Sequence, residues 1–119
     1  MIKISFDSVI STEPEKAFLL CNEAIVRGAI EADVKVVSFY PGAPTSEILD
    51  TFDKAGKFFD YKFSIAVNEK VALETAAGAA MAGFRSLTSM KSVGLNVASD
   101  SFFSLGYTGV KGGMVVICR

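Results

Sequence analysis

The chain has 119 residues, 50% of them apolar, and a formal net charge of −1 from 12 basic and 13 acidic side chains. This length permits one domain with a real core, and the balanced charge argues against nucleic acid or an anionic membrane surface as a partner. The chain has no histidine and 2 cysteines, which excludes Ser–His and Cys–His catalysis and a zinc or iron–sulfur site within it. Acid–base chemistry must therefore come from carboxylates, lysine, tyrosine or a cofactor.

The N-terminal sequence does not have the form of a signal peptide, and no window reaches about 18 consecutive apolar residues. We therefore expect a cytoplasmic chain. Cys21 and Cys118 form no CxxC pair, so we expect both to be buried, reduced thiols.

In the first third of the chain, residues 2–6 alternate apolar and polar side chains and predict a short strand. Residues 7–16 are mostly polar, contain Pro14 and predict a loop. Asn22 is a good N-cap for a helix over residues 23–32, in which apolar and small residues repeat at helical spacing.

Residues 34–39 form a compact run rich in β-branched side chains, typical of a strand buried on both faces. The next five, residues 40–44, include two prolines and a glycine and predict an irregular loop. Thr45 or Ser46 is expected to cap a helix that runs to about residue 58. Its predicted inner face consists of Ile48, Leu49, Phe52 and Ala55.

A buried strand is predicted within residues 61–67, with its apolar run at 63–67, and a helix over residues 69–83. Gly83 is expected to close this helix as a C-cap. Small residues give the helix a flat face, which would let another helix or a flat ligand approach its backbone. These residues are Ala72, Ala76, Ala79, Ala80 and Gly83.

The remainder predicts a strand at 86–90, a turn at 91–94, a helix at 95–105 and a last strand at 114–118. Strict alternation of strands and helices predicts an α/β fold: a three-layer open parallel sheet with helices on both faces. The segments that follow the strands, including Arg119, would then share the carboxyl edge of the sheet, where open α/β sheets bind ligands.

Glu69 is the foremost candidate residue, because it stands in the first turn of a helix just past a strand. It is either a general acid or base or a helix-dipole partner that contributes about 0.3–1 kcal/mol. Residues 40–46 could bind a ligand at a helix N-terminus or simply connect two elements, and residues 91–94 could form a second lip or a plain turn. The glycines of residues 106–113 have neither GxGxxG nor GxxxxGK[ST] spacing, so no nucleotide phosphate loop is expected.

Six motifs follow in order from residue 21: CNEAIVRGA, YPGAPTSEI, NEKVALE, AAGAA, MKSVGLNV and YTGVKGGM. With them the chain resembles the N-terminal pyrimidine-binding (PYR) domain of thiamine-diphosphate-dependent 2-oxoacid:ferredoxin oxidoreductases, in particular the alpha subunit of the indolepyruvate type. The resemblance covers nearly everything from Leu19 onward. It implies a single PYR-type domain over residues 1–119, expected to be the N-terminal part of a longer polypeptide or complex.

Glu69 matches the family's catalytic glutamate, whose implied role is a hydrogen bond to N1′ of the aminopyrimidine that activates the cofactor. Its apolar neighbours Val67, Val71 and Ala72 would desolvate the carboxylate. The resemblance implies cofactor binding by Tyr40, Pro41, Gly42, Asn68, Glu69, Ser92, Val93 and Gly94.

For the substrate, the resemblance implies contacts from Ala43, Thr45 and Arg119. Ala43 stands where many family members have a threonine, so this contact is expected to differ from that of the pyruvate enzymes.

The resemblance also implies partners that this chain does not supply. A separate diphosphate-binding domain or subunit would hold the diphosphate and its Mg²⁺, iron–sulfur clusters would lie elsewhere in the complex, and ferredoxin and coenzyme A would serve the complete enzyme. We expect a homo-oligomer, such as a dimer, and no metal site in this chain. Two other interpretations stay open: a binding or assembly module that has lost the cofactor role, and a different α/β enzyme whose ligand at this edge is not thiamine.

Overall fold

The computed structural model describes residues 6–119. The strand predicted over residues 2–6 lies outside this part, apart from Phe6, which has helical backbone angles. Four parallel strands form one sheet in the order β2-β1-β3-β4. Their bounds are Val36–Phe39 for β1, Lys62–Ile65 for β2, Ser86–Met90 for β3 and Met114–Cys118 for β4.

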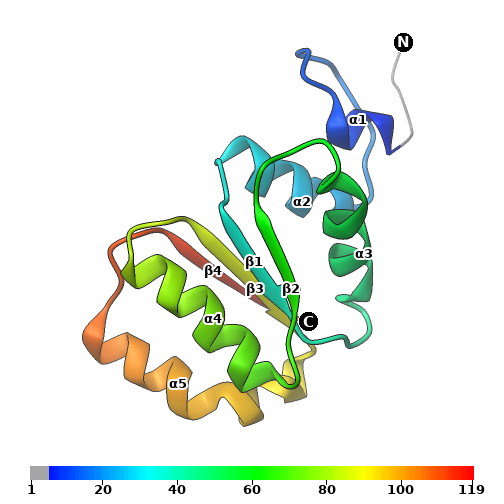
Figure 1. Ribbon diagram of the computed structural model, residues 1–119. Helices are drawn as coiled ribbons and strands as arrows, with labels where there is room; N and C mark the ends of the chain where they lie inside the picture. Colours follow the sequence, from blue (N-terminus) through cyan, green and yellow to red (C-terminus); the bar gives the residue numbers. More distant parts are fainter. Residues whose placement is uncertain (1–5) are drawn as a thin grey trace.

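Helices cover both faces of this sheet, as Figure 1 shows. α2 (Cys21–Glu31) and α3 (Ser46–Ala55) lie on one face, and α4 (Glu69–Met81) and α5 (Leu95–Thr108) lie on the other. The short 3₁₀ turn η1 (Ser92–Gly94) leads directly into α5. The predicted three-layer α/β architecture is therefore confirmed.

The face under α2 and α3 holds the larger apolar core. Because successive strand residues point to opposite faces, Val37 and Phe39 of β1 reach this side together with Leu87 of β3. They meet Phe52 of α3, whose ring centroid lies 5.6 Å from that of Phe39. The other buried members of this core are Val9, Val26, Val34 and Ile48.

On the opposite face, small polar side chains such as Ser86 and Thr88 lie next to α4, and Met90 packs with Leu73 and Ala98 in a second, smaller apolar core. Ala72, Ala76 and Ala80 are fully buried there, and the Ser86 hydroxyl donates a 2.7 Å hydrogen bond to the Ala76 carbonyl. Only side chains this small let a helix approach a sheet so closely. The prediction that this flat face receives another helix or a ligand is thus wrong, because the sheet of the same chain covers it.

The N-terminal region differs from the prediction in two places. Residues 7–10 form a short helix, α1 (Asp7–Ile10), where a loop was predicted, because Val9 is buried in the core. α2 begins at Cys21, two residues earlier than predicted, since the Glu23 carboxylate accepts a 2.9 Å hydrogen bond from the Leu20 amide. Asn22 therefore lies inside the helix, and its predicted role as an N-cap is wrong.

The other helix ends differ for reasons of backbone conformation. α3 ends at Ala55, where the poor helix former Gly56 follows, three residues before the predicted end. α5 passes Gly106 and stops only before Gly109, whose φ of +67° breaks the helix. Gly83, with φ of +98°, follows the Ala82 C-cap of α4, close to its predicted position.

The outer strands of the sheet are more exposed than predicted. β2 lies at an edge, with Ile65 57% and Val67 80% exposed, so the prediction of a buried strand at this position is wrong. Cys118 lies in the other edge strand, β4, and Cys21 lies at the start of α2. Both thiols are free and exposed, contrary to the prediction that they are buried. Partial desolvation still raises the pKa of the Cys118 thiol.

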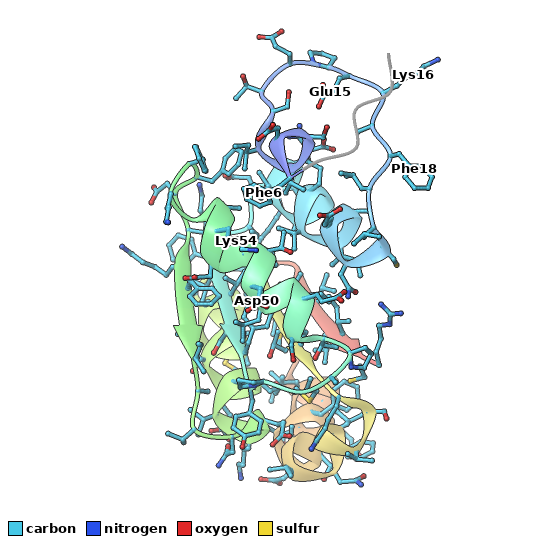
Figure 2. All side chains as sticks on the ribbon, turned by 90° about the vertical axis from the view of Figure 1, so that its right-hand side faces the viewer. Phe6, Glu15, Lys16, Phe18, Asp50 and Lys54 are labelled. Atoms are coloured by element: carbon cyan, nitrogen blue, oxygen red, sulfur yellow. The ribbon has the colours of Figure 1, made fainter. Side chains whose placement is uncertain are left out.

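Residues 11–18 form an arm that projects from the body of the molecule, with Phe18 pointing away from it (Figure 2), and Leu19 packs against the main core. The Arg27 guanidinium ties the base of this arm to α2 by donating to the carbonyls of Val9 and Ser11. None of the helices in residues 6–119 combines the length and the hydropathy that a membrane crossing requires.

Candidate functional site

Four segments meet at the carboxyl edge of the sheet. The residue 40–45 loop follows β1, Asn68 and Glu69 follow β2, residues 91–94 follow β3, and Arg119 follows β4. The Ser92 amide donates a 2.7 Å hydrogen bond to the Arg119 carbonyl, and the Lys91 side chain lies against Gly42. The predicted meeting of these segments at one edge is confirmed, and Figure 1 shows the C-terminus at this end of the sheet.

Glu69 is the first residue of α4 and is 5% exposed. Its helix is capped by the preceding Asn68, whose side-chain oxygen accepts a 2.9 Å hydrogen bond from the Val71 amide. The Glu69 side chain lies against Gly94: a Cβ built on that glycine would be 2.7 Å from Oε1 and 2.8 Å from Cγ of Glu69. Gly94 therefore leaves the room that the buried carboxylate occupies.

No hydrogen-bond donor or cation within residues 6–119 bonds to the Glu69 carboxylate. The adjacent ammonium group of Lys70 is directed to Asp100 instead, at 3.0 Å. The carboxylate oxygens keep some contact with solvent, because the fully buried side-chain oxygens without a partner in residues 6–119 are those of Ser8 and Thr88. The geometry therefore suits a ligand that brings its own hydrogen-bond donor or acceptor to this carboxyl group.

Exposed apolar side chains flank Glu69 and Gly94 along the chain. Val67 and Val71, predicted to desolvate the carboxylate, are 80% and 38% exposed, and Val93 and Val97 are 61% and 50% exposed. Ala72, the third of these predicted neighbours, is fully buried. Desolvation of the carboxylate by the three residues stays a prediction, and Gly94 packs against the same side chain. Exposed valines beside a buried polar group are typical of a site that receives a largely apolar, flat group.

The residue 40–45 loop is held in shape by its own hydrogen bonds. Thr45 is 2% exposed, and both its amide and its hydroxyl donate to the Gly42 carbonyl, at 2.9 and 2.8 Å. Thr45 therefore holds the loop in shape, and its predicted contact with the substrate stays a prediction. Pro41 and Ala43 are exposed, and Tyr40 is partly buried.

Sequence reasoning missed one residue of this edge, Asn22. Asn22 is 5% exposed, and its side chain is hydrogen-bonded. Its amide nitrogen donates to Oε2 of Glu47 at 2.6 Å and to the Pro44 carbonyl at 3.3 Å. Its amide oxygen accepts a 2.7 Å hydrogen bond from Nη1 of Arg119. The spacing of residues could have indicated that Asn22 is buried, because it stands one turn before the buried Val26 and so lies on the inner face of the same helix.

A surface hollow of about 470 Å³ lies at the opposite edge of the sheet. Lys35, Arg85 and Lys111 line it, and Lys35 is paired with Asp33 at 2.6 Å, which raises the pKa of the Lys35 ammonium group. None of the predicted site residues borders this hollow, so size alone does not identify the functional edge.

The fold and this edge define an α/β domain of the thiamine-diphosphate-binding class. Residues 27–119 match the family described as the thiamine-diphosphate-binding domain of pyruvate flavodoxin/ferredoxin oxidoreductase, and the chain belongs to this family. The resemblance seen in the sequence is thereby confirmed.

Within the family, the chain is similar to proteins named indolepyruvate oxidoreductase subunit IorA. It is 57% identical over 111 residues to that of Methanothermobacter thermautotrophicus, 50% over 115 residues to that of Archaeoglobus fulgidus, and 49% over 122 residues to that of Pyrococcus horikoshii. The matches cover 93%, 93% and 98% of this chain, but each covers 18% of the relative. The chain therefore spans less than a fifth of the length of these relatives.

Proposed function

We propose that this chain is the pyrimidine-binding domain of a thiamine-diphosphate-dependent 2-oxoacid oxidoreductase of the indolepyruvate type, and that Glu69 activates the cofactor. The observation that carries the proposal is the Glu69 carboxyl group, buried at the carboxyl edge of the sheet with no partner in the described residues. The family match and the names of the relatives support the same reaction class.

Each side chain at this edge has a distinct task in the proposal. Glu69 holds a proton or accepts a hydrogen bond at a ring nitrogen of the pyrimidine, and this interaction gains strength because the bound ring displaces water from the carboxyl group. Gly94 keeps the space beside it free, and the exposed valines of the two segments offer apolar surface to the bound ring. Contacts to the cofactor come from Tyr40, Pro41, Gly42, Asn68, Ser92 and Val93.

When bound, thiamine diphosphate supplies the carbanion chemistry that removes CO₂ from a 2-oxoacid. At the substrate end, the Arg119 guanidinium binds the carboxylate of the 2-oxoacid, since this group presents several N–H donors in a planar fork. Ala43 lies in the neighbouring loop without a hydroxyl and leaves more room for a substrate side chain.

The complete reaction needs parts beyond this domain. Residues 6–119 contain no cluster of three or more carboxylate, cysteine or histidine side chains that could hold a metal ion. In the proposal, a diphosphate-binding domain or subunit holds Mg²⁺, iron–sulfur clusters take up the electrons, and ferredoxin and coenzyme A are the reactants. The proposed setting is a cytoplasmic homo-oligomer in which this domain is the N-terminal part of a longer polypeptide or complex.

The test is Glu69→Gln in the complete enzyme, with proton–deuterium exchange at C2 of bound thiamine diphosphate as the measurement. We expect the exchange rate to fall by about a hundredfold or more, while the fold and the affinity for the diphosphate end stay intact. The matched control is Glu74→Gln in the same helix, because the Glu74 side chain is 51% exposed and bonds to Ser101. Undiminished exchange in Glu69→Gln would make Glu69 a helix-dipole partner, and absence of cofactor binding would make the domain an assembly module.

A further inference from the structure

We propose that Asn22 is a positioning residue that sets the Arg119 guanidinium and the residue 40–45 loop at a fixed relative position. This inference rests on the proposed function, in which Arg119 and Ala43 lie at the substrate end of the site. Asn22 belongs to α2, on the face of the sheet away from Glu69, so it acts only through the groups that it bonds.

The side chain of Asn22 is almost fully used by its hydrogen bonds. Its amide nitrogen donates to Oε2 of Glu47 and to the Pro44 carbonyl, at 2.6 and 3.3 Å, and its oxygen accepts from Arg119 at 2.7 Å. A side-chain amide has two N–H donors and one carbonyl acceptor, so these three contacts fix which end faces which partner. Burial to 5% exposure removes competing water, which makes each bond costly to break.

Arg119 is held at both its backbone and its head group. Its amide donates to the Met90 carbonyl at 3.3 Å, and its carbonyl accepts from the Ser92 amide at 2.7 Å. The Arg119 side chain that joins its backbone to Asn22 is long, and ordering it only when the substrate binds would cost conformational entropy. The hydrogen bond to Asn22 orders the Arg119 side chain before the substrate binds, so binding does not incur this cost.

The neutral character of Asn22 matters as much as its geometry. Among residues 6–119, Arg119 forms no ion pair, because the nearby Glu47 carboxylate bonds to the far end of the Asn22 amide. An amide oxygen orients the guanidinium without neutralising its charge. One Arg119 nitrogen is used by Asn22, and the remaining N–H donors are left for the carboxylate of a substrate.

The same amide also fixes the substrate loop. The Pro44 carbonyl that Asn22 binds directly follows Ala43, so Asn22 connects the loop after β1 with the residue after β4, 97 positions away in the sequence. Movement of either partner would change the distance between Ala43 and Arg119. We therefore expect Asn22 to influence substrate affinity more than the chemical step.

The test uses the complete enzyme and compares three variants. Two are the single substitutions Asn22→Ala and Asn22→Asp, and the third combines Asn22→Asp with Glu47→Gln. We expect Asn22→Ala to raise KM for the 2-oxoacid about tenfold, with a much smaller change in kcat. Exchange at C2 of thiamine diphosphate, which needs no substrate, should stay at the unmodified rate. Asn96→Ala is the matched control, because Asn96 is exposed on α5 and its side chain makes no hydrogen bond in residues 6–119.

Asn22→Asp places a carboxylate 2.6 Å from the Glu47 carboxylate, and two carboxylates at this distance cannot both be ionised. KM should then rise with pH through a new ionisation that the unmodified enzyme lacks. Adding Glu47→Gln supplies an amide donor to the introduced carboxylate and should abolish this pH dependence. Damage to the packing alone would give neither the pH dependence of KM nor its loss in the double variant.

An unchanged KM in Asn22→Ala, or an equal loss of C2 exchange and substrate affinity, would overturn the inference. If the unmodified enzyme showed no exchange at C2, the proposed function itself would fail and this inference with it. Normal exchange with an unchanged KM would reject only the role of Asn22.

Discussion

The carboxylate of Glu69 lies directly against the α-carbon of Gly94, at a place where a methyl group would come within 2.7 Å of Oε1. The backbone of Gly94 is ordinary, with φ of −68° and ψ of −22°, so any residue could adopt it. The requirement for glycine therefore comes from the neighbouring carboxylate alone. Gly94, in the segment after β3, thus limits the positions that the side chain of Glu69, the first residue of α4, can occupy.

Gly94→Ala should displace the Glu69 carboxylate without unfolding the domain. In the complete enzyme we expect exchange at C2 of thiamine diphosphate to fall by about tenfold or more, because a contact of this kind depends on placement within a fraction of an ångström. Gly106→Ala is the control, since a Cβ at that position meets nothing within 4 Å. Equal exchange rates in the two variants would contradict the geometric role of Gly94.

Ala76→Leu should test the close packing of α4 on the sheet. Ala76 is fully buried and its carbonyl accepts the Ser86 hydroxyl, so a larger side chain must push the helix away. We expect the free energy of unfolding of the chain to fall by about 1–3 kcal/mol, measured by urea denaturation. Thr75→Leu, at the exposed neighbouring position, should change it by less than about 0.5 kcal/mol.

Tyr61 should make stability fall at high pH. Burial, with a smaller contribution from the Asp53 charge, raises the pKa of Tyr61 from 10.0 to about 12. Between these values the unfolded chain loses a proton that the folded chain keeps, so this contribution is complete below pH 10 and is lost as pH rises toward 12.

The measurement for Tyr61 is urea denaturation as a function of pH. Tyr61→Phe keeps the edge-on contact with Phe52, at 5.5 Å, but removes the ionisable hydroxyl. The difference in stability between the unmodified chain and Tyr61→Phe should shrink above pH 10. Tyr107→Phe, at a position that is 94% exposed, should show no such difference.

Both cysteines should react with a thiol reagent in the folded chain. Cys21 and Cys118 are exposed and free, and the raised pKa of Cys118 predicts that its reaction speeds up as the pH increases. Single Cys→Ser variants assign each reaction to its residue. A requirement for denaturant before either thiol reacts would contradict the exposure described here.

Much of the fold could be predicted because its signals are local. Strands β3 and β4 have the bounds that the sequence predicts, and strict alternation with helices favours a parallel sheet. The parallel arrangement brings the loops after all four strands to one edge, so the meeting of Gly42, Glu69, Gly94 and Arg119 also follows from the sequence.

Other features of the site depend on contacts that no local pattern contains. Asparagine is a common N-cap residue, which is why the sequence predicts that role for Asn22. Only the tertiary structure brings Arg119 and Glu47 from distant segments into hydrogen bonds with its buried side chain. The same holds for Thr45, whose hydroxyl is used within its own loop.

By itself, the sequence determined the fold class, the family and the edge of the sheet at which to look, because periodicity and short motifs act over a few neighbouring residues. Tertiary structure alone decided which strands lie at the edges, that the alanines of α4 face the sheet, and that both thiols are exposed. These features depend on which segments, far apart in the chain, exclude water from one another, and an amino-acid pattern within one segment does not contain that information.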